Sequence, residues 1–369
     1  MKILFTSKHK NSPVYQLYKS GFEEDTGFLF DEALISEADV ILFTGFVEDY
    51  IAIKELKLKY PEKQFGIVDP RLNKINSVLN YIDFLIVDSI EMKDYYMRYN
   101  KPIHLYYEFF KLSVNRNKKD QEKIILGYHG NKVHLMGMYP KISKALEMIS
   151  KDYQIEFWAL YNIKKLGFWR HGRPNNVKIK DIQWSIDNFK YFLENVDIGI
   201  VPALMPVKRN FISRLFHSVS EVHFNESSND YLTRFKILTN PGRIFTFSVN
   251  KIPVIADMFP SAIQFIKDGE SGKIAFDTAG WFYAMKDLVL DKNLRDKFAD
   301  TFYGINQKYF DYETQNKNLI NFIHNNSQFN NSNLNFEQND KVINTLEFLF
   351  QKHFLFIKNI IYKLIGKIN

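Results

Sequence analysis

Short apolar runs separated by polar segments of helix length constrain the fold of this chain more than any other feature. Four such runs precede residue 110, at 3–5, 40–43, 65–68 and 84–87. Their apolar side chains are continuous rather than alternating, which is typical of strands covered on both faces in a parallel sheet. Segments such as 48–60 and 91–100 supply the connecting helices, and residues 103–107 add a fifth predicted strand.

A charged segment without apolar residues, 115–122, interrupts this pattern and predicts a linker. The alternation then resumes, with strands predicted at 124–127, 155–159, 177–179, 198–201 and 254–256 and helices at 139–151, 185–194 and 281–290. At 369 residues the chain is long enough for two α/β domains, which we assign to 1–118 and 119–324. Such domains share one natural ligand site, the cleft between the carboxyl ends of their sheets. The long insertion 203–236 predicts a lid or an acceptor-side element.

Composition excludes several classes of protein. Hydrophobic residues make up 46% of the chain and aromatic residues 16%, which fits a folded globular protein. The absence of cysteine excludes disulfides, zinc-thiolate sites and thiol nucleophiles. The net charge of +7 suits anionic partners, but the basic residues are scattered and form no nucleic-acid-binding signature. Residues 1–8 predict a strand rather than a signal peptide, and no window has the roughly 20 apolar residues that cross a bilayer.

The block from Asn240 to Gly272 concentrates the features of a ligand site. The run 253–256 predicts a buried strand, and the turn that follows lets Ser261 open a helix. A helix that starts just past a strand directs free backbone N–H groups into the crevice, where anions bind. Arg243, at the start of an earlier predicted helix, adds a permanent charge with forked donors suited to phosphate.

Taken in order, Arg243, the run 251–256 and the turn 268–272 resemble the donor-binding half of GT-B fold glycosyltransferases, which use nucleotide sugars. The likeness extends upstream to 126–131 and 195–202, and covers roughly residues 122–323. It implies two Rossmann-like domains facing each other, an acceptor-side domain followed by a donor domain, and a closing helix over 312–323 that crosses back to the first domain. One departure concerns the two glutamates that many retaining members carry, since Leu238 and Thr246 occupy those places. Donor identity and stereochemistry therefore stay open.

The candidate donor-binding residues are Arg243, Asn240, His129, Gly130, Asp257, Ser261 and Lys236. Arg243 is expected to neutralise the diphosphate, and the turn containing His129 and Gly130 to face the cleft. Helix capping is the alternative role for Asn240 and Ser261, and a solvated surface for Lys236. Because no Asp-x-Asp metal box is present, we expect no cofactor and no metal requirement.

The candidate catalytic residues are Asp69 and Asp88, which follow two apolar runs of the first domain. Their carboxylates are expected to project into the cleft, where a general base would take the proton of the acceptor. Capping or turn formation is the alternative role for each, and His9 is a third candidate base. An inverting reaction requires one of them, whereas a retaining reaction requires none.

The end of the chain has a different character. Residues 325–340 are rich in Asn, Ser and Gln and predict a flexible linker. Residues 341–369 place apolar side chains at helical spacing with five lysines and one acid, Glu347, so they predict a basic amphipathic helix on an anionic membrane surface. The alternative is a helix packed on the body or on a second subunit.

The sequence therefore predicts a cytoplasmic glycosyltransferase, peripheral on the inner face of the cell membrane. It would move a sugar from a nucleotide-diphosphate donor to a glycan or lipid-linked acceptor in cell-envelope polysaccharide biosynthesis. A catalytically inactive GT-B-like protein that binds sugar nucleotides or scaffolds a glycan-assembly complex is the alternative. A nucleotide-sugar epimerase is disfavoured because the chain has no Gly-rich cofactor fingerprint.

Overall fold

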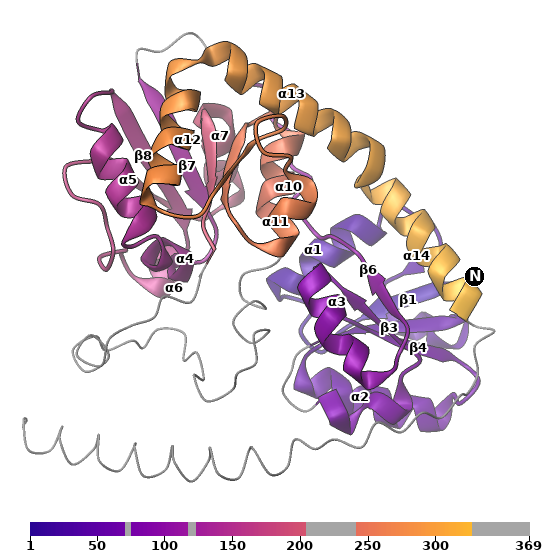
Figure 1. Cartoon of the computed structure of the whole chain (residues 1–369). Helices are drawn as coiled ribbons and strands as arrows, with labels where there is room; N and C mark the ends of the chain where they lie inside the picture. The colour runs from indigo at the N-terminus through magenta and orange to yellow at the C-terminus, as the bar shows by residue number, and fades with distance from the viewer. Residues whose placement is uncertain (71–74, 117–122, 204–240, 327–369) are drawn as a thin grey trace, which may run out of the picture.

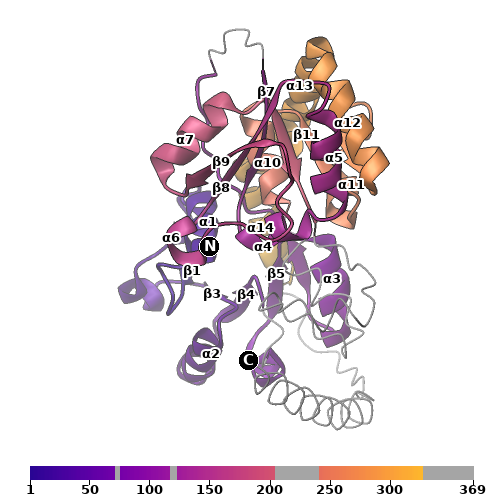
Figure 2. The same cartoon turned by 90° about the vertical axis from the view of Figure 1, so that its left-hand side faces the viewer.

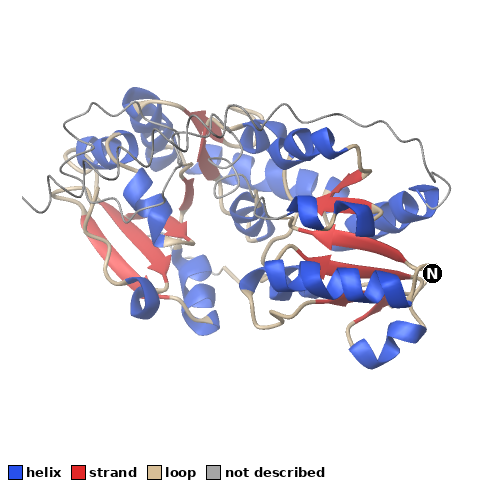
Figure 3. Ribbon diagram, turned by 90° about the horizontal axis from the view of Figure 1, so that it is seen from below, coloured by secondary structure: helices blue, strands red, loops and turns tan. Residues whose placement is uncertain are grey.

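The computed structural model describes residues 1–70, 75–116, 123–203 and 241–326, which form two α/β domains (Figure 1). Each domain contains one six-stranded parallel sheet. Figure 3 shows that helices flank each sheet. The predicted pair of Rossmann-like domains is confirmed. Lys236, Asn240, nearly all of the insertion 203–236, the Asn-rich segment beyond 326 and the tail 341–369 lie outside the described residues. No described helix has the length and apolar character needed to cross a membrane.

The first domain has the strand order β2-β1-β3-β4-β5-β6. Its strands are β1 (Ile3–Thr6), β2 (Phe28–Leu29), β3 (Val40–Thr44), β4 (Gln64–Val68), β5 (Phe84–Val87) and β6 (Ile103–Leu105), and its helices are α1 (Pro13–Phe22), α2 (Val47–Lys59) and α3 (Ile90–Tyr96). Five of these strands coincide with the predicted runs. The two-residue β2 has too little apolar sequence to be recognised in advance.

The second domain has the order β12-β11-β10-β7-β8-β9. Its strands are β7 (Ile124–His129), β8 (Ile155–Tyr161), β9 (Lys178–Gln183), β10 (Ile198–Val201), β11 (Val254–Asp257) and β12 (Lys273–Ala275). Its helices are α4 (Lys132–Gly137), α5 (Lys141–Ile149), α6 (Ile163–Leu166), α7 (Ile186–Asn195), α10 (Gly242–Val249), α11 (Pro260–Phe265) and α12 (Thr278–Leu290). The helix predicted over 139–151 begins two residues later, because Pro140 precedes its first turn.

Two final helices join the domains. α13 (Lys292–Tyr309) packs on the second domain (Figures 1 and 2), and α14 (Tyr312–Asn326) runs along the first (Figure 1). Side chains of α14 bond to the backbone and side chains that follow β6: the Tyr106 hydroxyl donates to Asn316 at 2.8 Å, and the Tyr107 N–H donates to Gln315 at 2.6 Å. The helix that crosses back, implied by the family resemblance, is therefore present.

Candidate functional site

Arg243 lies in the first turn of α10, close to the carboxyl end of β7. Its guanidinium is 3.4 Å from the Tyr128 hydroxyl and 3.5 Å from Nδ1 of His134, and its central carbon lies 5.5 Å from the centre of the Tyr128 ring. These contacts are long, and no carboxylate among the described residues pairs with Arg243. Among the described residues, no acid therefore cancels the permanent positive charge of Arg243.

The backbone of Gly130 approaches this cation closely. Gly130 adopts φ 137°, a conformation that side chains with a Cβ rarely adopt, and a Cβ placed there would lie 2.7 Å from the Tyr128 hydroxyl and 3.6 Å from Cδ of Arg243. The structure thus brings two predicted donor-binding residues, Gly130 and Arg243, close together. Sequence reasoning did not single out Tyr128, which lies near the end of β7, two positions before the Gly130 turn.

His129 points to the opposite face of β7, into the core. Its ring packs 4.9 Å from Phe189, 6.1 Å from Phe192 and 5.0 Å from Phe247, and Nε2 is buried without a partner among the described residues. Burial, aided by the charge of Arg243, lowers the pKa of His129 to about 3. The ring is therefore neutral at physiological pH, and its contact with a donor stays a prediction.

We expect His129→Phe to make the protein less sensitive to acid. The folded pKa of about 3 lies below the usual value near 6.5, so the unfolded chain binds a proton first as the pH falls. The contribution of neutral His129 to the free energy of unfolding is therefore fully present above about pH 6.5 and is lost as the pH falls towards 3. A phenyl ring does not titrate, so the variant does not lose stability in this way. The substitution also removes a buried nitrogen that lacks a partner among the described residues. Urea unfolding of the wild type and the variant at pH 7 and pH 5 measures this effect. If the free energy of unfolding falls by the same amount between pH 7 and pH 5 in both proteins, the prediction is wrong. UDP titration of the same variant tests the donor contact separately.

Asp257, at the end of β11, is fully buried and has partners from α5, from α12 and from the segment that follows β10. Its carboxylate accepts the Ala203 N–H at 2.7 Å and the Trp281 indole N–H at 3.0 Å, and it pairs with Lys141 of α5. Burial raises its pKa, against the pull of Lys141. These bonds give Asp257 a structural role in the second domain. Its predicted contact with a sugar hydroxyl stays a prediction.

Ser261 meets a carboxylate from the other domain. Its N–H and its hydroxyl donate to Glu91 of α3 at 2.9 and 2.5 Å, and burial raises the pKa of Glu91. Beside this pair, Tyr107 and Gln264 are within 3.3 Å of each other across the same junction. Because Glu91 already occupies the start of α11, the predicted phosphate contact of Ser261 requires that these bonds rearrange.

Asp69 and Asp88 follow neighbouring strands of the first domain. Asp69 comes directly after β4 and Asp88 directly after β5, and the Asp69 N–H donates to the Ile86 carbonyl at 3.0 Å. Both side chains are largely buried, and Asp69 has a left-handed backbone with φ 49°. The structure therefore places both predicted bases at one edge of the sheet, and their catalytic role stays a prediction.

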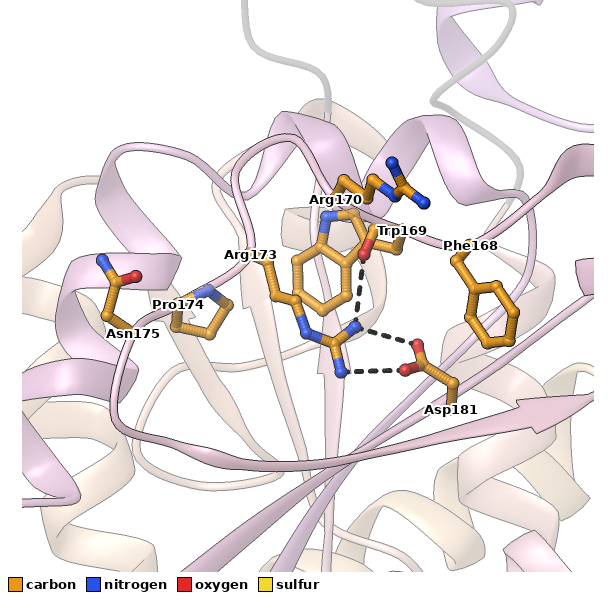
Figure 4. Close-up of a pocket in the computed structure, with 7 residues that line it drawn as sticks. All are labelled: Phe168, Trp169, Arg170, Arg173, Pro174, Asn175 and Asp181. Atoms are coloured by element: carbon orange, nitrogen blue, oxygen red, sulfur yellow. Dashed lines mark hydrogen bonds and ion pairs between the residues drawn. The ribbon is translucent and has the colours of Figure 1, made fainter.

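A separate hollow of about 450 Å³ lies on the second domain between α6 and β9 (Figure 4). Its lining is Phe168, Trp169, Arg170, Arg173, Pro174, Asn175 and Asp181. Both terminal nitrogens of Arg173 bond to the Asp181 carboxylate, at 3.1 and 2.8 Å, so that charge is already neutralised. The hollow contains none of the residues predicted from the sequence.

Several solved structures share this architecture. HepE of Anabaena, in complex with UDP, matches with a TM-score of 0.56 at 11% identity over 88% of this chain and 100% of that one. A glycosyltransferase from Rickettsia africae matches with a TM-score of 0.55 at 12% identity over 89% and 99%. TarM matches with a TM-score of 0.53 at 14% identity over 77% of this chain and 54% of that one, so the match spans about half of TarM.

These likenesses establish the fold: two facing Rossmann-like domains of the GT-B type. No protein-family model matches the sequence, and no curated protein matches it.

Proposed function

We propose that the protein is a glycosyltransferase that moves a sugar from a nucleotide-diphosphate donor to a glycan or lipid-linked acceptor. The observation that carries the proposal is Arg243, a cation without a carboxylate partner among the described residues, beside the Gly130 turn at the carboxyl end of β7. Nucleotide diphosphates bind at such places in open α/β sheets. Support comes from HepE, whose structures contain UDP, or UDP and glucose, on the same fold.

In this reaction Arg243 stabilises the negative charge that develops on the leaving diphosphate. Asp69 or Asp88 then takes the proton from the attacking acceptor hydroxyl if the reaction inverts the anomeric centre. If the configuration is retained, neither carboxylate is needed as a base.

The second candidate function is sugar-nucleotide binding without catalysis. Thr246 favours this second function, because it stands where many retaining members have a glutamate. Its hydroxyl is buried and donates to the Gly242 carbonyl at 2.8 Å within α10, so this position provides no carboxylate to contact a ligand. Hydrolysis of a panel of nucleotide sugars, with UDP and GDP titrations alongside, separates the two functions. Slow donor hydrolysis supports transfer, binding without hydrolysis supports the second candidate, and absence of both contradicts both.

We further propose that the protein works on cell-envelope polysaccharide from the cytoplasmic face of the membrane, held there by residues 341–369. Each lysine near an anionic membrane surface contributes roughly 1 kcal/mol to the free energy of binding. The apolar residues at helical spacing in this segment would insert into the membrane surface and strengthen the binding. A chain ending near Ser327 is expected to bind UDP normally but to lose co-sedimentation with anionic vesicles. If the full-length protein does not co-sediment with anionic vesicles at low salt, the proposed membrane binding is wrong.

Catalysis is expected to continue after chelation. Arg243 provides the positive charge that a divalent ion supplies in metal-dependent transferases, so turnover measured in excess EDTA should match turnover before treatment. Loss of turnover that Mg²⁺ or Mn²⁺ restores would show that a metal takes part.

A further inference from the structure

The hollow beside α6 and β9 is shaped by hydrogen bonds between its own side chains. Both terminal nitrogens of Arg173 bond to the Asp181 carboxylate, which also accepts the Tyr161 hydroxyl at 3.0 Å. The ring of Trp169 is buried, and its indole N–H donates to the His171 carbonyl at 2.6 Å. With a volume of about 450 Å³, the hollow is within the range of small-molecule sites, roughly 300–1,000 Å³. These bonds fix the shape of the hollow before a ligand binds.

Arg170, in the lining of the hollow, has a guanidinium group without a hydrogen bond or ion pair among the described residues. Its side chain is exposed, and Figure 4 draws bonds to Arg173 but none to Arg170. The connection from β8 to β9, residues 162–177, contains four lysines and arginines and no acid. The Asp181 carboxylate already pairs with Arg173, so the guanidinium of Arg170 is available to an anion.

An exposed aromatic ring lies two residues before Arg170. Phe168 is 63% exposed and belongs to the same lining. One exposed apolar side chain is ordinary on a protein surface, but a ring beside a hollow and an unpaired guanidinium group offers a ligand two different contacts. Asp181 accepts three side-chain hydrogen bonds from the described residues, of about four that a carboxylate can accept, so a hydroxyl can still bond to it. The other acid beside the lining, Glu147 of α5, accepts the backbone N–H of Asn175 at 2.6 Å and its side-chain amide at 3.2 Å.

We propose that this hollow binds a negatively charged sugar unit, whose carboxylate or phosphate pairs with Arg170 and whose ring packs on Phe168. The forked guanidinium group suits both anions, and an aromatic side chain suits the apolar face of a sugar ring. A flat membrane surface is disfavoured, because a planar array of headgroups does not enter a hollow. The site lies on the second domain apart from Arg243, and the inference does not depend on the proposed glycosyl transfer. Such a site gives the protein a preference for glycans that carry negative charge.

Arg170→Gln tests the assignment because it removes the charge from an exposed side chain that has no partner among the described residues. The fold is therefore expected to stay intact, as circular dichroism measures. Binding of methyl glucuronide and of glucose 6-phosphate, followed by NMR titration, is expected to weaken about tenfold, the loss of one charge-assisted contact. Phe168→Ala is expected to weaken both about fivefold. Lys164→Gln is the matched control, because it removes one positive charge from the same connection outside the lining and should bind both probes like the wild type.

Two further probes separate the charge from the ring. Methyl glucoside has the ring without the charge, and glycerol 3-phosphate has the phosphate of a lipid headgroup without the ring. We expect the wild type to bind both more weakly than it binds the charged sugars. If methyl glucoside binds as well as methyl glucuronide, or glycerol 3-phosphate as well as glucose 6-phosphate, the proposed ligand is wrong. No binding of either charged sugar, or equal losses in Arg170→Gln and Lys164→Gln, would overturn the site.

UDP distinguishes this site from that of the proposed transferase. Saturating UDP is expected to leave the binding of methyl glucuronide unchanged, because the lining of the hollow contains neither Arg243 nor Gly130. Displacement of methyl glucuronide by UDP would show that the charged sugar binds beside Arg243 and not in the hollow. The UDP affinity of Arg170→Gln should equal that of the wild type, so the proposed transferase can hold or fail independently of this site.

Discussion

Replacing Asp257 by Ala is expected to lower the free energy of unfolding by about 3–5 kcal/mol, the usual result of removing one partner of a buried ion pair. The substitution leaves the charge of Lys141 without its partner in a site where that side chain is 15% exposed. It also leaves the Ala203 N–H and the Trp281 indole N–H without their acceptor. Urea denaturation followed by circular dichroism measures the change.

Two comparisons make this result specific. Asp300→Ala breaks an aspartate–lysine pair that is exposed to solvent and should leave the free energy of unfolding almost unchanged. The double variant Asp257→Ala, Lys141→Met should lose less stability than the sum of the two single variants, because it contains no uncompensated charge. If the losses of the two single variants simply add in the double variant, the interaction between Asp257 and Lys141 contributes nothing to the free energy of unfolding.

Arg243→Ala should weaken UDP binding by about 1.5–3 kcal/mol, or roughly 10- to 150-fold, while the fold stays intact. Among the described residues, the hydrogen bonds of the lost side chain are long contacts to Tyr128 and His134, so we expect little effect on the fold. The UDP affinity of Arg243→Lys should lie between those of Arg243→Ala and the wild type, since lysine keeps the positive charge but lacks the forked donors of the guanidinium group. Calorimetric titration with UDP measures all three.

Arg173→Ala is the matched control, because it removes an arginine from the hollow on the same domain without touching the Gly130 turn. We expect its UDP affinity to equal that of the wild type. Should Arg173→Ala lose affinity while Arg243→Ala keeps it, the donor would bind in the hollow and the assignment of Arg243 would be wrong.

The sequence predicted the parallel sheets well because a strand covered on both faces must be apolar throughout, and runs such as 40–43 and 84–87 satisfy that requirement. It also pointed to Arg243, at the start of a predicted helix, and to Gly130, in the turn after a predicted strand, and the structure brings the two close together. It could not predict Glu91 at the start of α11. That contact joins residues 170 positions apart, and no local pattern identifies which acid of one domain faces which helix of the other.

The orientation of single side chains was equally inaccessible. His129 and Tyr128 are adjacent, and only the register of β7 decides that the tyrosine faces Arg243 while the histidine enters an aromatic core. In the same way, Asp257 looked like a ligand-facing turn residue. Its partners Lys141 and Trp281 come from helices whose approach is set by the whole domain.

The crossing of α14 has a consequence for the order in which the chain is made. Tyr312 of this helix bonds to both the N–H and the carbonyl of Phe109, and Asn316 holds the Gly21 carbonyl at 2.9 Å. The first domain therefore emerges from the ribosome with one flank uncovered, and the side chains that close it are synthesised about two hundred residues later. Domains generally fold in the order of synthesis, but this one completes its packing only after its successor has been translated.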